Sequence, residues 1–557
     1  MNFCIRLGMG ILLLGVFLLH AAEIDVTRFG ARGDGVADDS AAIRAAVAEL
    51  KKNGGGTLRF PAGRYRIATP GPGGIFLDGI SNAVICFDPE AVLLMDNLLP
   101  DGSGGGHGVT VRGPARNIEL RNVKVVWKNK PKVRSNGDGF RFEGYPDPLR
   151  TLAQIRMVNC EVGKSAQTGA VFMGCSNVTV RDFTVRESWA DGLHFNACSN
   201  IEVDGVTGIR TGDDALAFVT YYAEKFEGET GTVFSLPELG AWSNSGASAK
   251  RIRVQGGNAN GIRIAGSKFI SISDVEVEDK VGCGIIIDAG PLTAVNHWQY
   301  LASRDVSIRD VTVKGCNTGL YIMQFDPVTD NPAFSRFDVQ CETFRIENCS
   351  NDSVHLSGVS GVRLRDFVTS GCRWRFRTFT DCRVDNATID AGTFLLIGRD
   401  ETGDPARLGE LRNSDSRITG VRIRNGNLVI QRCRNFEAQD VGISGSGGSA
   451  LTLFQTLDSR ISRLKIKDAN LSGSVPFAIQ VLQSRGIHFE DVYVTGSGSL
   501  KAAFELGGGD DRFTTDRISI GGLQLVPSSI PPVFAQSGPY GVKNWKFGPS
   551  DGSLSPR

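Results

Sequence analysis

The sequence predicts an all-β protein: a right-handed parallel β-helix, a solenoid of about 23-residue coils, with an N-terminal capping helix. Three observations lead to this fold class. Short motifs recur at a fixed period, the segments between turns are too short for helices, and one helical pattern stands near the N-terminal end.

The period is seen most clearly in the middle of the chain. Cys175-Ser-Asn-Val-Thr-Val180 recurs 23 residues later as Cys198-Ser-Asn-Ile-Glu-Val203, and Gly169-Ala-Val-Phe172 recurs at the same displacement as Gly192-Leu-His-Phe195. Each period holds short β-branched segments of alternating polarity, separated by Gly, Asn, Asp and Ser turns. Such segments predict strands that stack coil upon coil.

Two repeated positions are expected to form internal ladders at the corners of the coils, namely Cys175 over Cys198 and Asn177 over Asn200. The cysteine spacing contains no C-x-x-C pair, so zinc binding by cysteines is not expected. Most cysteines are expected to be small buried apolar residues, and disulfides remain open for one or two pairs.

The ends differ in composition from the repeat. Arg6, the apolar run Gly8–Leu19 and the small residues Ala21 and Ala22 are typical of a secretory signal peptide. A helix is expected from about Ser40 to Lys51, with Asp38 or Asp39 as its N-cap. The predicted organisation is a signal peptide (1–22), an N-terminal cap (23–56), the β-helix (57–525, with a loop insertion at 221–249) and an irregular C-terminal cap (526–557).

The charge balance limits the classes of partner. The chain has 61 basic and 60 acidic side chains, which argues against nucleic-acid binding and against capture by an anionic membrane. After the leader, no apolar stretch is long enough to span a bilayer. We expect a secreted or periplasmic protein, and its oligomeric state is left open.

Three acids are the candidate catalytic residues. Asp191 precedes Gly192, Asp214 precedes Ala215 one period later, and Asp213 adjoins Asp214. Neighbouring parallel strands lie about 4.8 Å apart, so the first and third carboxylates are expected to stack. Like charges this close push one pKa up, which provides a general acid beside a general base for an acetal. A turn residue needs no such stack of carboxylates, so function is the favoured explanation.

The same two columns suggest residues that bind the substrate. The position before the repeated glycine also carries Asp138, Asn260 and, further on, Ser353, whereas the position two residues after it carries Arg141, His194, Arg263 and Tyr321. The insertion at 221–249 adds aromatic side chains beside the acids, and aromatic faces stack on sugar rings. The predicted substrate-binding residues are His194, Arg263, Asn260, Asp138 and Trp242.

Two N-terminal segments carry a family resemblance. Phe29-Gly-Ala-Arg-Gly-Asp-Gly-Val-Ala-Asp-Asp-Ser40 and Gly54-Gly-Gly-Thr-Leu-Arg-Phe-Pro-Ala-Gly-Arg-Tyr65 resemble the signature of the pectate-lyase-like β-helix superfamily, which includes the polygalacturonases of glycoside hydrolase family 28. The signature is specific for the fold, and Asp34, Asp38 and Asp39 within it are expected to be turn and cap residues.

A second resemblance concerns the acids. Trp189–Phe195 and Thr211–Phe218 are similar to the polygalacturonase stretch in which an N-T-D motif is followed one coil later by G-D-D. The resemblance implies that Asp213 protonates the leaving oxygen and that Asp191 and Asp214 activate water for inversion. The His of the family's G-H-G motif is missing at Asn260-Gly261, and Ala265 stands where its R-I-K motif has Lys. These departures leave an acidic or a neutral glycan open.

The expected function is that of a secreted glycoside hydrolase that cleaves a poly- or oligosaccharide with an Asp triad, by inversion and without a metal or other cofactor. Two alternatives remain open. A Ca²⁺-dependent polysaccharide lyase or epimerase would bind the ion through the acids and use a cation such as Arg263 to take the proton. A non-catalytic glycan-binding β-helix would bind a glycan with the same residues and catalyse no reaction.

Overall fold

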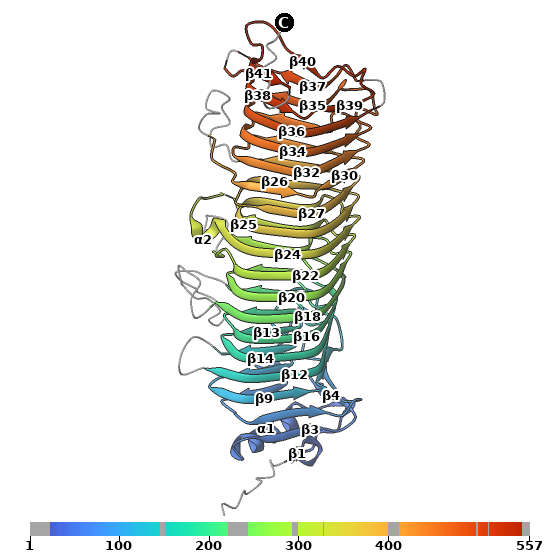
Figure 1. The fold of residues 1–557 in the computed structure, drawn as a ribbon. Coiled ribbons are helices and arrows are strands. Elements are labelled where there is room, and N and C mark those ends of the chain that lie inside the picture. Colours follow the sequence, from blue (N-terminus) through green and yellow to red (C-terminus); the bar gives the residue numbers. More distant parts are fainter. Residues whose placement is uncertain are drawn as a thin grey trace, which may run out of the picture.

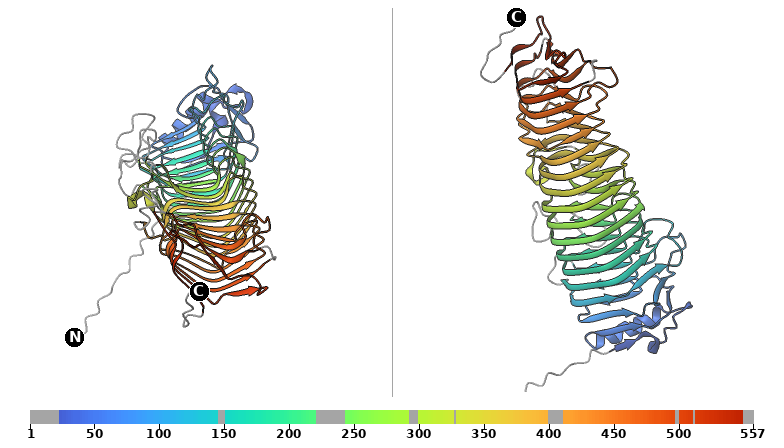
Figure 2. Two further views of the ribbon diagram at one scale, coloured as in Figure 1. Left: turned by 90° about the horizontal axis from the view of Figure 1, so that it is seen from above. Right: turned by 45° about the vertical axis from the view of Figure 1, so that its right-hand side comes forward.

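The computed structural model describes residues 23–144, 151–220, 243–291, 299–326, 328–398, 411–496, 500–510 and 512–548. The chain forms a right-handed parallel β-helix whose coils stack along one axis from the N-terminal to the C-terminal end (Figures 1 and 2). The predicted signal peptide and most of the predicted insertion (221–242) lie outside the described residues.

One face of each coil is a short strand, and these strands pair in parallel to form the sheet that carries the candidate site. Its strands are β5 (Ile75–Asp78), β8 (Val109–Arg112), β11 (Phe140–Glu143), β13 (Ala170–Met173), β15 (Leu193–Asn196), β17 (Leu216–Val219), β19 (Ile262–Ala265), β21 (Cys283–Ala289), β23 (Thr318–Gln324), β25 (Asp352–Ser370), β26 (Arg373–Thr380), β28 (Thr393–Ile397), β31 (Asn427–Gln431), β33 (Leu451–Phe454), β35 (Phe477–Leu482), β37 (Ala502–Gly507) and β40 (Val533–Ala535).

The other two faces are formed in mid-chain by long strands that bend at a left-handed residue, such as Asn159 in β12 or Asp182 in β14. These strands are β12 (Leu152–Gly163), β14 (Cys175–Arg186), β16 (Ser199–Thr211), β18 (Asn244–Gly257), β20 (Ser267–Glu278), β22 (Arg304–Lys314), β24 (Arg336–Glu347), β27 (Arg383–Asp390), β32 (Phe436–Ser444), β34 (Leu457–Lys467) and β36 (Arg485–Thr495).

Towards both ends these faces are separate strands. They are β1 (Glu23–Asp25), β2 (Asp34–Asp38), β3 (Gly56–Phe60), β4 (Arg64–Ile67), β6 (Ala83–Phe87), β7 (Val92–Met95), β9 (Ala115–Arg121), β10 (Lys124–Trp127), β29 (Ser416–Thr419), β30 (Arg422–Arg424), β38 (Asp516–Gly521), β39 (Gln524–Val526) and β41 (Lys543–Phe547). The helices are the 3-10 turn η1 (Val26–Phe29), α1 (Ser40–Lys52) and α2 (Pro332–Ser335). No helix of the described residues is long and apolar enough to cross a membrane.

Alternation along the site sheet separates the core from the outer wall. Phe142, Phe172, Phe195 and Phe218 point inward on successive coils, with ring centroids 4.2, 5.0 and 5.2 Å apart. The residues next to these phenylalanines in each strand, such as His194, point outward because successive side chains of a strand face opposite sides. The 23-residue period therefore places one outward group per coil above a stacked aromatic core.

The two repeated corner positions differ in their orientation. Cys175 and Cys198 are buried, and the Cys175 amide donates to Cys198 Sγ at 3.4 Å, so this column is internal as expected. Asn177 and Asn200 form a side-chain ladder of 3.2 Å but lie exposed, with φ near +54°. Asparagine tolerates this left-handed corner, and its column is external rather than internal. The eleven cysteines of the described residues are all free thiols.

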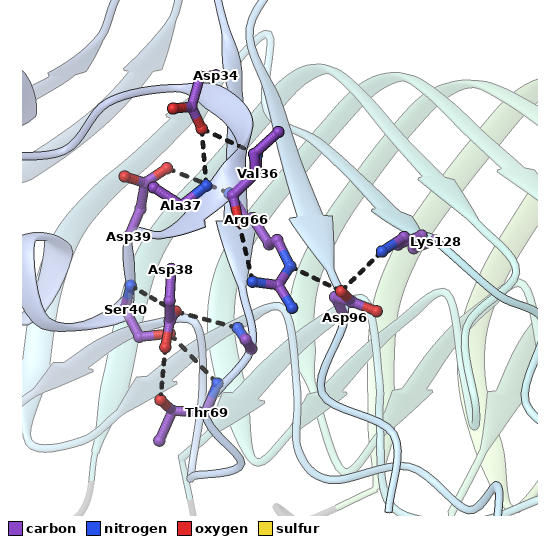
Figure 3. Close-up of polar contacts among 11 residues, drawn as sticks. Asp34, Val36, Ala37, Asp38, Asp39, Ser40, Arg66, Thr69, Asp96 and Lys128 are labelled. Atoms are coloured by element: carbon purple, nitrogen blue, oxygen red, sulfur yellow. Dashed lines mark hydrogen bonds and ion pairs between the residues drawn. The ribbon is translucent and has the colours of Figure 1, made fainter.

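The N-terminal motif acids hold the first coils together (Figure 3). Asp34 accepts from the Val36 and Ala37 amides at 2.8 Å each, and Asp38 accepts from the Ser40 amide at 3.1 Å at the start of α1. Asp39 instead accepts from the Arg32 amide at 2.7 Å and from the Arg66 amide at 3.2 Å. All three are turn and cap residues, as expected. Asp39 stands at the N-cap position of α1 without a side-chain hydrogen bond to the helix, and the Asp38 side chain accepts from the first amide of the helix instead.

The solenoid extends beyond the predicted limits at both ends. The strand β1 pairs with β3, and β40 and β41 pair with β37 and β38, so coil-forming strands run from Glu23 to Phe547. Residues 244–249 of the predicted insertion also belong to a coil, because β18 begins at Asn244. The short strands at the C-terminal end, which lie among Pro and Gly residues, were not predicted from the repeat.

Candidate active site

The three predicted acids meet at one corner of the site sheet. Asp191 precedes β15 and Asp214 precedes β17, and Leu193 pairs with Leu216, so the two acids stack on adjacent coils. One carboxylate oxygen from each of Asp191, Asp213 and Asp214 lies within 4.8 Å of the others. The stacking expected from the period is therefore present, and the turn brings in the third acid.

Asp191 is held by a histidine. Its Oδ2 lies 2.5 Å from His194 Nδ1, and its Oδ1 accepts from the Asp214 amide at 3.1 Å. Burial alone would raise the pKa of Asp191, but His194, Arg134 and Arg263 lower it below its ordinary value. His194, predicted to contact the substrate, thus lies in position to orient Asp191 and to keep it ionised.

Asp214 is the acid with the opposite electrostatic surroundings. Burial, the Asp191 charge and the Asp213 charge raise the pKa of Asp214 to about 7, although Arg263 and Asn260 oppose the rise. Asn260 donates to Asp214 Oδ1 through Nδ2 at 2.8 Å and through its own amide at 3.2 Å. Asn260 Oδ1 accepts from the Cys283 amide, so the side-chain amide of this predicted binding residue links Asp214 to the next coil.

Asp213 is the most accessible member of the cluster. Its side chain is 32% exposed, whereas Asp191 is 7% and Asp214 is 3% exposed. Arg134 Nη1 lies 2.9 Å from Asp213 Oδ2, and Arg134 comes from the connection between β10 and β11. The burial of Asp191 and Asp214 leaves Asp213 as the acid that a ligand reaches first.

Lys280 was missed by the sequence reasoning. Its buried Nζ donates to Thr211 Oγ1 and to the Asp213 carbonyl, both at 3.0 Å. Gly257 pairs in register with the same Thr211, and a Cβ on Gly257 would lie 2.3 Å from the Thr211 carbonyl oxygen. Burial lowers the pKa of Lys280 to about 8, against the opposing pull of the three carboxylates. The signal was available, because Lys280 stands one period after Gly257.

Two other predicted binding residues are engaged in buried ion pairs. Arg263 makes a bidentate pair with Asp288, at 3.1 and 2.7 Å, and its guanidinium lies 4.9 Å from the centre of the Tyr300 ring. Asp138 is 1% exposed and contacts Arg141 Nη1 at 3.0 Å. Both side chains serve the wall rather than an open groove.

Further positions of the predicted columns need correction. Trp242 lies outside the described residues. The column position assigned to Ser353 belongs to Asp352, which pairs in register with Thr318. The longer connection before β25 displaced the count by one residue.

The acid cluster meets only part of what a Ca²⁺ site requires. Calcium takes six to eight oxygen ligands. Both oxygens of Asp191, one of Asp214 and one of Asp213 already accept hydrogen bonds or ion pairs, and the Lys280 ammonium lies against the turn. The three carboxylates lie close enough together to supply one ligand atom each to a cation, which is half of the six oxygens that calcium needs at least.

A family model described as rhamnogalacturonase A/epimerase, pectate lyase-like, matches residues 23–349. Mannuronan C5-epimerase AlgE4 of Azotobacter vinelandii is 29% identical over 185 residues, which are 31% of this chain and 32% of that protein. The aligned region thus spans about a third of the relative.

Solved structures of similar shape include the A-module of mannuronan C-5 epimerase AlgE6 from A. vinelandii, with 16% identity, a TM-score of 0.31 and coverage of 90% of this chain and 98% of that one. A family 28 exopolygalacturonase from Yersinia enterocolitica has 13% identity, a TM-score of 0.33 and coverage of 86% and 79%.

Proposed function

Because the chain belongs to the rhamnogalacturonase A/epimerase, pectate lyase-like family, a family of carbohydrate-active β-helix enzymes, we propose that it is a glycoside hydrolase acting on a poly- or oligosaccharide. One observation carries the proposal. An acid with a pKa of about 7, Asp214, lies within 4.8 Å of two further carboxylates. A proton donor beside ionised carboxylates is what the hydrolysis of an acetal requires.

The surroundings of the acids support a division of roles. Asp214 holds the proton near neutral pH and delivers it to the leaving oxygen. Asp191, oriented by His194 and with a lowered pKa, serves as the ionised carboxylate. Asp213 is the most exposed and contacts the sugar. The resemblance implied Asp213 as the proton donor, whereas the burial of Asp214 favours Asp214 in that role.

The separation of the acids bears on stereochemistry. Inversion requires a gap of about 6.5–9.5 Å between carboxyl groups to hold a water, whereas retention uses about 5–5.5 Å. Oxygens within 4.8 Å of one another favour retention over the inversion expected from the resemblance. The configuration of the first product, followed by NMR, distinguishes the two.

The proposal is tested with purified protein on a panel of neutral, uronate-containing and sulfated glycans. New reducing ends, without an unsaturated sugar and with activity retained in chelator, support the hydrolase. The similarity to the epimerase AlgE4, and over 46 residues to alginate lyase 7 of A. vinelandii, favours an epimerase or lyase as the second candidate. Unsaturated products, or a changed uronate configuration in an uncut polymer, would replace the hydrolase with that candidate.

We expect the turnover rate to fall as the pH rises through about 7, because the raised pKa of Asp214 makes its protonated form the minor one above that value. Rate measurements on a confirmed substrate between pH 4 and pH 9 check this. An alkaline limb that is unchanged in Asp214→Asn would contradict the assignment of that limb to Asp214.

Lys280→Met is expected to move the alkaline limb to higher pH, since loss of the buried cation beside Asp214, Asp213 and Asp191 favours the protonated acid. The pH–rate profile is the measurement. Lys314→Met, which removes an exposed lysine of β22, is the matched control and should leave the profile unchanged. A lower rate with the limb in its original place would mean that Lys280 supports only the fold of the turn.

A further inference from the structure

A second cluster of charged residues lies on the same wall, further toward the C-terminal end. Asp352 occupies the column of Asp191, and His355 occupies the column of His194, five coils later by the pairings of the intervening strands. The strands that carry it, β25 and β26, lie above β13 in Figure 1. At about 4.8 Å per coil, the two clusters are roughly 24 Å apart.

This second cluster repeats the Asp-x-x-His motif with the opposite kind of neighbour. His355 Nδ1 lies 3.2 Å from Asp352 Oδ2, as His194 does from Asp191 at 2.5 Å. Two arginines take the place of the two extra acids. Arg373 Nε lies 2.6 Å and Arg375 Nη2 lies 2.9 Å from the fully buried Asp352 carboxylate. Two guanidinium charges against one carboxylate leave the cluster positive.

Three buried polar atoms of the cluster have no hydrogen-bond partner among the described residues, namely His355 Nε2, Arg375 Nε and Asp352 Oδ2. The last of these has the Arg375 guanidinium as an ion-pair partner at 2.9 Å, so the two nitrogens are the atoms that lack any partner of opposite kind. His355 is 8% exposed, and its ring stacks on Tyr321 with centroids 4.4 Å apart. A buried polar nitrogen without a partner costs about 1–3 kcal/mol, which a ligand oxygen would recover. These atoms therefore mark a place that a polar ligand completes.

The cluster adjoins room for such a ligand. An open depression of about 470 Å³ lies along the next coils of the same corner, and Asn351 and Arg373 form part of its lining. Glycines at three successive corners, Gly371, Gly392 and Gly426, also line the depression. Asn351 Oδ1 accepts from Arg373 Nη2 at 3.0 Å, which fixes the guanidinium at the edge of the depression.

We infer that Asp352, His355, Arg373 and Arg375 form a second ligand site, which binds the anionic group of a sugar residue in the glycan that the Asp191 cluster acts on. The carboxylate of a uronate and the sulfate of a sulfated sugar share the required chemistry, because a guanidinium binds either with charge-assisted hydrogen bonds. The inference rests on the proposed function for its substrate and names that substrate as anionic. The family match ends at residue 349, before the cluster begins.

The test is calorimetric titration of the whole protein with oligouronates, sulfated oligosaccharides and neutral oligosaccharides of equal length. Arg375→Met and Arg373→Met should each weaken binding of one charged class by about tenfold to a hundredfold and leave neutral ligands unaffected. The class that responds identifies the anion. Arg365→Met is the matched control, since Arg365 is an exposed arginine of β25 that pairs with Glu342.

Because Arg375 contacts a buried acid, His355→Gln provides a second variant that leaves both arginines on Asp352. It should weaken the same class of ligand, with an unchanged circular dichroism melt. Equal affinity of all variants and wild type for charged ligands would overturn the inference. So would equal affinity of the wild type for charged and neutral ligands. Binding is measured without turnover, so a protein that binds anionic glycans through these arginines but cleaves none refutes only the proposed hydrolase.

Discussion

Asp214→Asn and Asp213→Asn are each expected to lower kcat by about a hundredfold to ten-thousandfold while the protein stays folded. Asn keeps the shape of the side chain but cannot give a proton to the leaving oxygen or carry a negative charge. In Asp214→Asn the Oδ1 atom can still accept from Asn260, so the turn keeps its hydrogen bonds. The measurement is steady-state kinetics on a substrate confirmed for the wild type.

The control for these variants is Asp310→Asn, which changes an exposed acid of β22 and should be fully active. Unchanged kcat in both Asp213→Asn and Asp214→Asn would refute acid–base catalysis by the cluster. A loss in one variant alone would identify the proton donor, and the burial of Asp214 leads us to expect the larger loss there.

Asp214 also makes stability depend on pH. Its folded pKa of about 7 lies above the ordinary value of 3.8, so the folded protein binds the proton more tightly than the unfolded chain. The wild type should therefore lose stability, on the order of a few kcal/mol, as the pH rises from about 4 to 7. Asp214→Asn removes this dependence, and thermal melts at several pH values show whether its loss of stability over the same range is smaller.

Arg263→Met is expected to destabilise the middle of the solenoid by about 3–5 kcal/mol, because it leaves the buried Asp288 carboxylate without its partner. The effect should be local, since each coil contacts only its neighbours. Hydrogen exchange of the β19 and β21 amides measures it better than one melting temperature does.

The double variant Arg263→Met/Asp288→Asn is the control for that prediction. Removing the stranded charge should restore much of the protection in β19 and β21, whereas an interaction that was merely steric would leave the double variant as weak as the single one. Unchanged exchange in Arg263→Met would show that the pair contributes little. The sequence placed Arg263 among the substrate-binding residues, because it could not show that Asp288 pairs with the guanidinium.

The repeat made the stacked acids predictable. Asp191 and Asp214 stand one period apart, and parallel strands in register convert that spacing into contact. The same reasoning could not place Arg134, which reaches Asp213 from a connection between strands where the period does not apply. It also could not tell on which side of the wall a column lies, so Asn177 and Asn200 were placed inside the coil.

Lys280 and Asp352 show two further limits. Lys280 stands one period after Gly257, but the period does not show which groups its long side chain reaches, namely Thr211 Oγ1 and the Asp213 carbonyl. Asp352 was missed because one connection is longer than the period, which moved the count to Ser353. The predicted limits of the solenoid failed at its ends, where strands are short and their sequences irregular.

The in-register pairing of the strands in the site sheet has a consequence for how this protein can be altered by evolution or design. Because backbone hydrogen bonds hold neighbouring parallel strands about 4.8 Å apart, and the strands from β15 to β25 pair in register, the distance from the acid cluster to the arginine cluster is a whole number of coils and does not depend on loop length. Gaining or losing one repeat between them would lengthen or shorten the wall by about 4.8 Å and leave both clusters intact. The spacing between the two clusters can therefore change only in steps of one coil.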